Sequence, residues 1–320
     1  MIVRWGLDEL EPLLAELGIE RPFLVGSDRW ADLPLRVTGR WSDVPSDRIA
    51  DVVAAAGGAD GLLAIGGGSA IDLAKAVSAE TGLPLVSIPT TYSGSEWTDF
   101  FGVRDPDRRM KGGGSAAHPA AIVYEPRLTL DLPREQSGGT ALNALAHCAE
   151  ALYVAGRNPE GDREALEGAR LIGEALPKVL ADGHDVEARR TLLQGAQHAG
   201  AALGSAGLAL GHAMAQALGG RYGIAHGAAN ALCLPPALRF NAAVAAAEIA
   251  RFGEALHAAD PVTRTEELAR MAGFERLRDL GVPEDELDEV AEATALRAGA
   301  KANPRPASPA EIAELLRSIW

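Results

Sequence analysis

Residues 62–76 read LLAIGGGSAIDLAKA, and this segment most clearly indicates the fold of the first part of the chain. The apolar run LLAI is typical of a short buried strand, and AIDLAKA has the spacing of an amphipathic helix. Between them lie Gly66, Gly67, Gly68 and Ser69, with Ser69 expected at the helix N-cap. A strand, a glycine turn and a helix in this order can present backbone N–H groups and a helix N-terminus to a phosphate. The same glycines also fit a tight turn that binds nothing.

Similar strand patterns recur on both sides of this turn. Each is a short apolar run bounded by turn residues. They lie at residues 21–26, 59–68, 84–91 and 120–126. Residues 6–18, GLDELEPLLAELG, have the pattern of an amphipathic helix that Gly18 is expected to end. Short apolar strands that alternate with helices predict a mostly parallel sheet covered on both faces.

From about residue 136 the sequence has the pattern of helices alone. Four segments carry helical periodicity, and no part of the later sequence reads as a convincing strand. The segments are TALNALAHCAEALYVAG, DREALEGARLIGEALPKVLADG, DVEARRTLLQGAQHAGAALG and AAVAAAEIARFGEALHA. We therefore predict an α/β, Rossmann-like parallel-sheet domain over residues 1–134, followed by an all-α C-terminal domain over residues 135–320. The boundary is expected near Pro133.

The composition excludes several classes of protein. The 320 residues carry a net charge of −14, which argues against a nucleic-acid or anionic-membrane partner. The sequence has no run of eighteen apolar residues, so no membrane span is expected, and residues 1–14 do not read as a secretory signal. Cys148 and Cys233 lie in apolar, helix-like stretches and suit a reducing compartment. A cytoplasmic globular protein is expected.

A second candidate loop follows the strand at residues 84–91. Residues 89–99 read PTTYSGSEWTD and are rich in glycine and small hydroxyl residues. Open α/β sheets bind nucleotides at the carboxyl ends of neighbouring strands, so Thr90, Thr91 and Ser95 are candidate cofactor-binding residues. The alternative is that their hydroxyls only form a local turn or a helix cap.

Three histidines in apolar, glycine-rich surroundings are candidate catalytic residues. Asn143 and His147 are four positions apart and project from one helical face. His212 and His226 follow, separated by glycines that predict a break between two helices. A single histidine on an apolar helix is more often a core residue, but imidazoles can also bind a metal, transfer protons or bind an anion. The remaining histidines lie in loops or ordinary helices and are treated as background. They are His118, His184, His198 and His257.

These motifs together resemble the iron-containing (group III) alcohol dehydrogenase superfamily and, within it, the maleylacetate reductases most. The matching pieces occur in the same order along the chain. They are GGGSAIDLAKA, PTTYSGSE, AAIVYEPRLTLDLP, ALNALAHCAEALY, GHAMAQALGGRYGIAHGAANALCLPPALRFN and NPRPAS. The resemblance to the reductases rests on PTTYSGSE, on Asn143 and on NPRP at residues 303–306.

The resemblance implies a dehydroquinate-synthase-like architecture with the active site in the cleft between two domains. It implies that the pyrophosphate of a nicotinamide cofactor is held by Gly66, Gly67, Gly68 and Ser69. It further implies that the nicotinamide and ribose lie along Thr90, Thr91, Ser95, Tyr92 and Lys111. Tyr92 is also a candidate catalytic residue. A homodimer is expected, because the superfamily often dimerises.

The resemblance also identifies the positions of a possible metal site. In metal-dependent members an Asp and a His, four residues apart, join two later histidines to hold iron or zinc. The corresponding residues here are Asn143, His147, His212 and His226. Asn143 lacks the carboxylate charge, which removes a large attraction for a divalent ion, although three imidazoles alone can hold zinc. Metal is not expected, and if zinc or iron is present its ligands are the three histidines.

Other departures from the family pattern concern proton transfer and the cofactor. Gln216 and Pro236 stand where relatives often have histidines. Only about 35 residues separate the strand at 21–26 from LLAIGGG, where the family usually fits another helix and strand. Ser27 aligns with an Asp that binds the ribose hydroxyls in many NAD-preferring relatives, so Ser27 is a candidate cofactor residue and NADPH is admissible.

The sequence therefore favours an NADH- or NADPH-dependent reductase of maleylacetate or a similar unsaturated or oxo dicarboxylic acid. His147 and His212 are expected to orient the substrate and donate a proton, with His226 in support. Arg239 and Arg305 are weaker candidates for binding a substrate carboxylate. The alternatives are a metal-dependent alcohol dehydrogenase, a non-redox lyase or isomerase with a degenerate cofactor site, and a binding protein without catalysis.

Overall fold

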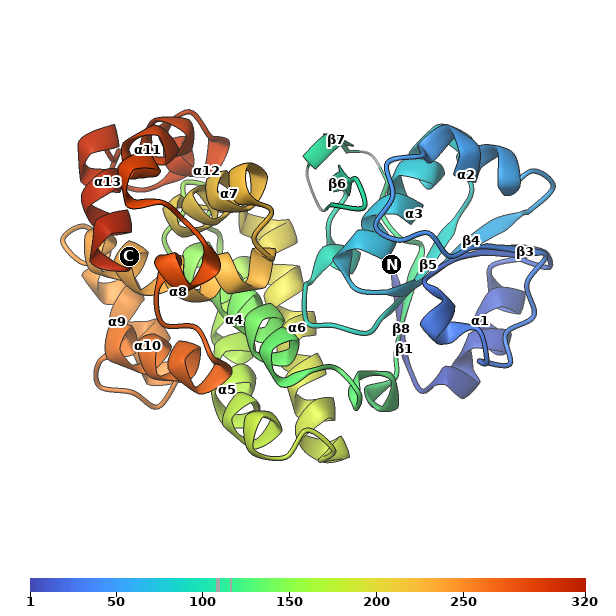
Figure 1. Cartoon of the computed structure of the whole chain (residues 1–320). Coiled ribbons are helices and arrows are strands. Elements are labelled where there is room, and N and C mark those ends of the chain that lie inside the picture. The colour runs from blue at the N-terminus through green and yellow to red at the C-terminus, as the bar shows by residue number, and fades with distance from the viewer. Residues whose placement is uncertain (108–109, 116) are drawn as a thin grey trace. The chain divides into compact units, whose positions relative to one another are not determined.

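Two units, each with its own core, make up the chain in the computed structural model, which describes residues 1–107, 110–115 and 117–320 except for the side chains of Met110 and Lys111 (Figure 1). Unit 1 comprises Met1–Thr91 and Ser95–Thr129, and unit 2 comprises Tyr92–Gly94 and Leu130–Trp320. The chain therefore passes from one unit to the other three times. The predicted boundary at residue 134 falls on the first residue of helix α4 (Arg134–Ala151).

Unit 1 is built on a six-stranded sheet in the order β1-β8-β5-β4-β2-β3, in which every neighbouring pair is parallel. The strands are β1 (Ile2–Trp5), β2 (Pro22–Val25), β3 (Gly39–Trp41), β4 (Gly61–Gly66), β5 (Leu85–Pro89) and β8 (Ala121–Tyr124). A separate antiparallel pair is formed by β6 (Phe101–Arg104) and β7 (Met110–Gly114). The predicted parallel sheet is confirmed.

Helices cover both faces of this sheet. They are α1 (Leu10–Glu16), α2 (Ile49–Ala55) and α3 (Gly68–Thr81). Along β4 the buried side chains alternate between two cores. Leu63 and Ile65 pack with α1, and Leu62 and Ala64 pack with α2 and α3. A strand whose two faces are both buried reads as a continuous apolar run, which is what the sequence of β4 shows.

The segment between β2 and β4 is the one that the sequence predicts to be shorter than in the family it resembles. It contains the short 3-10 helix η2 (Asp28–Trp30), strand β3 and helix α2. Strand β3 has only three residues and pairs with β2 at the sheet edge. A strand this short carries too few residues for a period-two pattern to be recognised.

Unit 2 is helical, as predicted, and within the described ranges every strand belongs to unit 1. After α4 its helices are α5 (Pro159–Ala181), α6 (Val186–Ala206), α7 (Leu210–Tyr222), α8 (His226–Asn241), α9 (Ala246–Ala255), α10 (Pro261–Ala272), α11 (Leu287–Ala295), α12 (Ala298–Ala302) and α13 (Pro309–Ser318). Helix α4 is central, since it packs against α5, α6, α8 and α10. The backbones of α4 and α8 meet at Gly139 and Gly227. A Cβ added to Gly227 would lie 2.5 Å from the Gly139 carbonyl carbon, so only glycine at position 227 permits this contact.

Two further sequence expectations can be compared with the structure. Cys148 and Cys233 are both buried and unbridged. None of the helices in the part of the chain that the structure describes combines the length and apolar character needed to span a bilayer.

Candidate active site

The glycine turn of unit 1 joins β4 to α3. Gly66 adopts a φ of +148°, which favours glycine, and Gly67 is the N-cap of α3. The sequence predicts Ser69 at the N-cap, and this prediction is wrong. Ser69 is the second residue of the helix, and it is exposed. The helix starts earlier because the extended backbone of Gly67 already allows the next residue to enter the first turn. The N–H groups of that turn have no partners within the helix.

The end of β5 lies directly against this turn. The Thr90 N–H donates to the Gly66 carbonyl oxygen at 2.9 Å, and a Cβ on Gly67 would lie 3.0 Å from Thr91 Cγ2. Thr91 Oγ1 is buried and has no hydrogen-bond partner among the described residues. A helix N-terminus, an approach that only glycine permits and a hydroxyl without a partner fit the pyrophosphate of a dinucleotide.

A buried polar network that the sequence reading missed lies beside the turn. The Ser95 hydroxyl donates to Asp72 Oδ1, and the Gly102 N–H donates to Asp72 Oδ2 at 3.0 Å. Lys75 Nζ, fully buried, donates to Thr98 Oγ1 at 2.9 Å. Burial raises the pKa of Asp72 and lowers that of Lys75. The network fixes residues 95–102 to α3 and uses the Ser95 hydroxyl, which the sequence assigns to the cofactor.

A second buried acid lies nearby in unit 1. Glu96 Oε1 accepts a hydrogen bond from the Tyr124 hydroxyl at 2.9 Å, and that hydroxyl accepts one from Trp97 Nε1 at 2.8 Å. Glu96 Oε2 is buried without a partner in the described ranges. Burial raises the pKa of Glu96. The two charges in AIDLAKA, Asp72 and Lys75, and the single charge in PTTYSGSEW, Glu96, are the sequence signals that would have revealed both networks.

Two further cofactor candidates belong to unit 1. Ser27 is the N-cap residue of η2 and follows the carboxyl end of β2, the strand that pairs in parallel with β4. Lys111 belongs to β7, and its side chain lies outside the described residues.

In unit 2 the three predicted histidines lie together. The rings of His147 and His212 are stacked with centroids 4.7 Å apart, and the His212 and His226 centroids are 5.7 Å apart. They come from three different helices: α4, α7 and the first residue of α8. The glycines at residues 219, 220 and 223 precede the predicted break, and Gly223 ends α7 in the left-handed conformation.

Asn143 joins this cluster through both ends of its amide. Its Oδ1 accepts from Asn230 Nδ2 at 2.8 Å and lies 3.3 Å from His212 Nε2, while its Nδ2 donates to the Ser93 carbonyl oxygen at 3.3 Å. Asn230 Nδ2 also lies 3.0 Å from His226 Nε2. Asn230 is one helical turn after His226, so the sequence spacing alone would have placed it on this face.

Glu150 is the carboxylate of the cluster, and the sequence reading missed it. Its Oε2 lies 2.8 Å from His212 Nδ1 and accepts from the Ala209 N–H at 2.6 Å, while Oε1 accepts from the His212 N–H at 3.1 Å. Glu150 and His212 are both fully buried. A carboxylate at this helix N-terminus is favourable and holds the imidazole in one orientation. The signal was available, because Glu150 is the one charge in ALNALAHCAEALY and follows His147 by three residues.

His147 differs from His212 in its surroundings. Burial lowers the pKa of His147 well below its usual value, and the neighbouring His212 and His226 add to this effect. Its Nδ1 has no hydrogen-bond partner in the part of the chain that is described. At neutral pH His147 is therefore a neutral imidazole.

The predicted catalytic residue Tyr92 is buried in unit 2. Its hydroxyl accepts a hydrogen bond from Arg189 Nη1 at 3.0 Å.

The weaker arginine candidates pair with acidic side chains. Arg239 bonds Glu266, and Arg305 lies 2.9 Å from Glu311. Gln216 is half-buried in α7, and Pro236 is buried within α8.

Comparison with known proteins extends over both units. Residues 5–126 match the family profile described as iron-containing alcohol dehydrogenase, and residues 138–320 match the profile described as Fe-containing alcohol dehydrogenase family, C-terminal. The second match alone spans more than half of the chain. The chain belongs to the iron-containing alcohol dehydrogenase family.

Several similar members of the family are maleylacetate reductases. The enzyme of Sphingobium indicum is 40% identical over 260 residues, covering 81% of this chain and 73% of that protein. The enzyme of Pseudomonas knackmussii is 36% identical over 306 residues, covering 90% and 87%. The crystal structure of maleylacetate reductase from Agrobacterium tumefaciens superposes with a TM-score of 0.90 and 30% identity, covering 100% of this chain and 95% of the other. The predicted family and fold are confirmed.

The family name implies iron, but the side chains of the cluster do not fit a divalent cation as they stand. The Asn230 amide directs N–H donors at Asn143 Oδ1 and His226 Nε2, two atoms that would have to face the ion. Glu150 is turned to His212 Nδ1 and two backbone N–H groups. Among residues 1–107, 110–115 and 117–320, no three His, Cys, Asp or Glu side chains are grouped to hold one ion.

Proposed function

We propose that this member of the iron-containing alcohol dehydrogenase family is an NAD(P)H-dependent reductase of maleylacetate, or of a similar unsaturated or oxo dicarboxylic acid, and that it works without a bound metal. The supporting observation is the cluster of three imidazoles and two amides in unit 2, all buried except the half-buried His226, in which Glu150 is turned toward His212. A cluster without a free carboxylate suits an anionic substrate. The curated relatives named maleylacetate reductase support this substrate class.

The glycine turn of unit 1 is the proposed site of the cofactor pyrophosphate. A Cβ on Gly66 or Gly67 would press against a neighbouring side chain, Gly68 and the exposed Ser69 begin the first helical turn, and the Thr91 hydroxyl is available for a further hydrogen bond. NADH or NADPH supplies a hydride when bound. The chain supplies binding and orientation, because the cofactor carries the redox chemistry itself.

His212 and His147 have different proposed roles in unit 2. His212 is oriented by Glu150 at Nδ1, which leaves Nε2 directed into the cluster. A carboxylate at Nδ1 balances a positive charge on the ring, so His212 is the proposed proton donor and carboxylate-binding group. His147 is neutral because of its lowered pKa and orients the substrate by hydrogen bonding. His226 accepts from Asn230 at Nε2 and supports the other two.

The first test is a titration of the purified protein with NADH and NADPH, followed by a turnover assay with maleylacetate. We expect micromolar binding of at least one cofactor, about −8 kcal/mol, and oxidation of that cofactor only when maleylacetate is added. The His212→Asn variant is expected to bind the cofactor normally and to lose activity by at least about a hundredfold. Failure to bind either nicotinamide would contradict the proposal and favour a non-redox reaction.

Metal independence has its own test. We expect substoichiometric zinc and iron in the purified protein and full activity after treatment with a chelator. Stoichiometric metal together with loss of activity on chelation would instead make this chain a metal-dependent alcohol dehydrogenase. The expected cytoplasmic location, homodimer and absence of a nucleic-acid partner are also proposals, and light scattering on the purified protein tests the dimer.

A further inference from the structure

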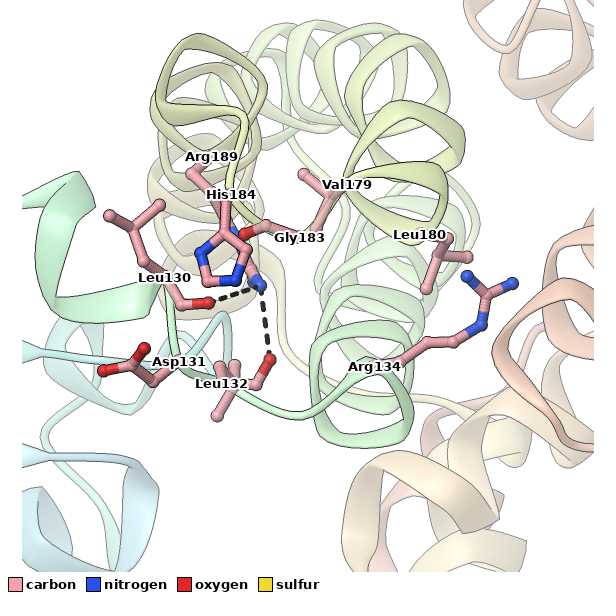
Figure 2. Close-up of a pocket in the computed structure, with 9 residues that line it drawn as sticks. All are labelled: Leu130, Asp131, Leu132, Arg134, Val179, Leu180, Gly183, His184 and Arg189. Atoms are coloured by element: carbon pink, nitrogen blue, oxygen red, sulfur yellow. Dashed lines mark hydrogen bonds between the residues drawn. The ribbon is translucent and has the colours of Figure 1, made fainter.

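Arg189 of α6 is a buried arginine whose hydrogen bonds reach three separate segments of unit 2. Its side chain lies at the wall of a pocket of about 360 Å³, and Figure 2 shows it directed at the main-chain oxygens of Leu130 and Leu132. Nη2 donates to these oxygens at 3.4 and 3.2 Å. Nη1 donates to the Tyr92 hydroxyl at 3.0 Å and to Ser137 Oγ at 2.7 Å.

The fifth hydrogen bond completes the set of donors. Nε donates to the Gly183 carbonyl oxygen at 2.9 Å, so five bonds match the five N–H groups of a guanidinium. The acceptors are three carbonyl and two hydroxyl oxygens, and no carboxylate is among them. Arg189 is only 1% exposed. Burying a cation is costly unless every donor has an acceptor. Movement of any of these five acceptors would therefore leave a buried N–H of Arg189 unpaired and destabilise the fold.

The segments that Arg189 holds are those at which the chain enters unit 2. Tyr92 begins the three-residue stretch of unit 2 that interrupts unit 1, and Leu130 begins the long remainder. One guanidinium therefore ties together the beginnings of both stretches. It also ties them to Ser137 in the second turn of α4, the helix that carries Asn143 and His147.

The short stretch Tyr92–Gly94 in turn contacts the histidine cluster. The Ser93 carbonyl oxygen accepts from Asn143 Nδ2 at 3.3 Å. Gly94 has a φ of +74°, and a Cβ built on it would lie 3.6 Å from His147 Nδ1. The residues next to Tyr92 thus form one wall of the cluster, and the Tyr92 hydroxyl is their anchor to Arg189.

We infer that Arg189 is a positioning residue for the proposed reductase: through the Tyr92 hydroxyl it holds Ser93 and Gly94 against Asn143 and His147. The expected effect on catalysis rests on the proposed function, whereas the contacts themselves all lie within unit 2. Tyr92 is then part of the support of the site, and its hydroxyl does not touch the substrate.

The test compares two identical substitutions in unit 2. Tyr92→Phe removes one of the two acceptors of Arg189 Nη1 and leaves Ser137 Oγ in place. Tyr222→Phe removes the hydroxyl of the last residue of α7, which donates to Glu286. For each variant we measure kcat, KM and deuterium uptake of peptides covering residues 89–96. We expect Tyr92→Phe to lower kcat about tenfold, the scale of one hydrogen bond to a charged group, and to speed uptake in residues 89–96. KM for maleylacetate is expected to change less than kcat, and Tyr222→Phe should leave all three unchanged.

Arg189→Met and Arg189→Lys complete the experiment. Arg189→Met keeps the Tyr92 hydroxyl but removes all five N–H donors of the guanidinium, so it should lower kcat at least as much as Tyr92→Phe. Arg189→Lys retains the charge without the planar fork and should lie between Arg189→Met and the native protein. If Arg189→Met fails to fold, Tyr92→Phe and Arg189→Lys still decide the result.

Two results would overturn the inference. One is an unchanged kcat with unchanged uptake in Tyr92→Phe. The other is a lowered kcat without faster uptake at residues 89–96, which would make the Tyr92 hydroxyl itself a catalytic group. If the native protein does not reduce maleylacetate at all, the proposed function fails, while the uptake measurements still decide whether Arg189 holds this segment.

Discussion

Glu96 illustrates how the residues near the glycine turn differ from ordinary core residues. It is fully buried, and one of its two carboxylate oxygens has no hydrogen-bond partner within the described ranges. Burial favours the neutral acid and raises the pKa of Glu96. Ionisation of Glu96 in the folded protein therefore costs stability.

This cost has a definite pH dependence. Because the pKa of Glu96 is raised in the folded state, the unfolded chain ionises first as the pH rises above about 4.5, and stability falls until the folded state ionises too. Glu96→Gln should therefore be more stable than the native protein at pH 8, by about 1 kcal/mol, and equal to it at pH 4. Urea unfolding at both values measures the difference.

Glu311 provides a control of opposite sign. Hydrogen bonds from Ser308 lower the pKa of Glu311, so its contribution is present above pH 4.5 and is lost as the pH falls through its folded pKa. Glu311→Gln should destabilise the protein at pH 8. If Glu96→Gln behaves like Glu311→Gln, the burial argument for Glu96 is wrong.

The proposed metal independence depends on the side chain of Asn143, which carries an amide where a metal-binding member has a carboxylate. Asn143→Asp replaces the amide by a carboxylate beside three imidazoles, which restores the attraction for a divalent ion. We expect this variant to bind zinc at least about tenfold more tightly than the native protein, or 1.4 kcal/mol. Metal analysis after dialysis against zinc measures it.

The matched control for Asn143→Asp is Asn241→Asp. Asn241 and Asn303 form another buried asparagine pair, joined by hydrogen bonds of 3.0 and 2.8 Å. Equal zinc uptake by both variants would show that the histidine cluster does not provide the site.

Helix α4 organises unit 2 because it places three polar groups along one face. Asn143, His147 and Glu150 occupy successive turns of α4 within its stretch from residue 141 to residue 151, which is buried throughout. Glu150 joins α4 to α7, since it accepts hydrogen bonds from two backbone N–H groups at the start of α7 and from the ring of His212. The orientation of His212 is therefore a property of the α4–α7 contact.

Substitution of Glu150 tests this contact. Glu150→Ala leaves three buried donors without an acceptor and should destabilise the protein by about 3 kcal/mol. Glu150→Gln retains an acceptor and should cost about half as much, while still lowering kcat through loss of the charge at His212. Thermal unfolding and kcat measured together distinguish the two. Equal stability of all three proteins would mean that Glu150 does not join the helices.

At the scale of the whole molecule, the sequence predicts long, periodic elements well. The parallel sheet, the helical second half and the grouping of His147, His212 and His226 follow from periodicity and from the family motifs. Strands β1 and β3 and the β6–β7 pair were missed because none of them is a continuous apolar run: β1, β3 and β6 each contain an arginine, and β7 contains a lysine and three glycines. Arg189 was missed for another reason: its partners are carbonyls and hydroxyls far apart in the sequence, and no spacing rule connects them.

The assignment of the cofactor to unit 1 and of the substrate to unit 2 predicts separate protection from hydrogen exchange. NADH or NADPH should slow deuterium uptake mainly in peptides covering residues 66–71 and 89–91. A saturated dicarboxylate should slow it in peptides covering residues 143–150 and 209–230. Protection of the second set by the cofactor alone, with none in the first, would contradict the assignment to unit 1.

The discontinuity of the two units limits how the chain can be recombined with its relatives. A fragment that begins at Leu130 lacks Tyr92, Ser93 and Gly94, which belong to unit 2. Such a fragment would leave Arg189 Nη1 and Asn143 Nδ2 each without one of their acceptors. A functional chimera therefore needs two exchanges at once, with this tripeptide taken from the same parent as the helical half. The tripeptide Tyr92–Gly94, although flanked in the sequence by unit 1, is therefore inherited together with Leu130–Trp320.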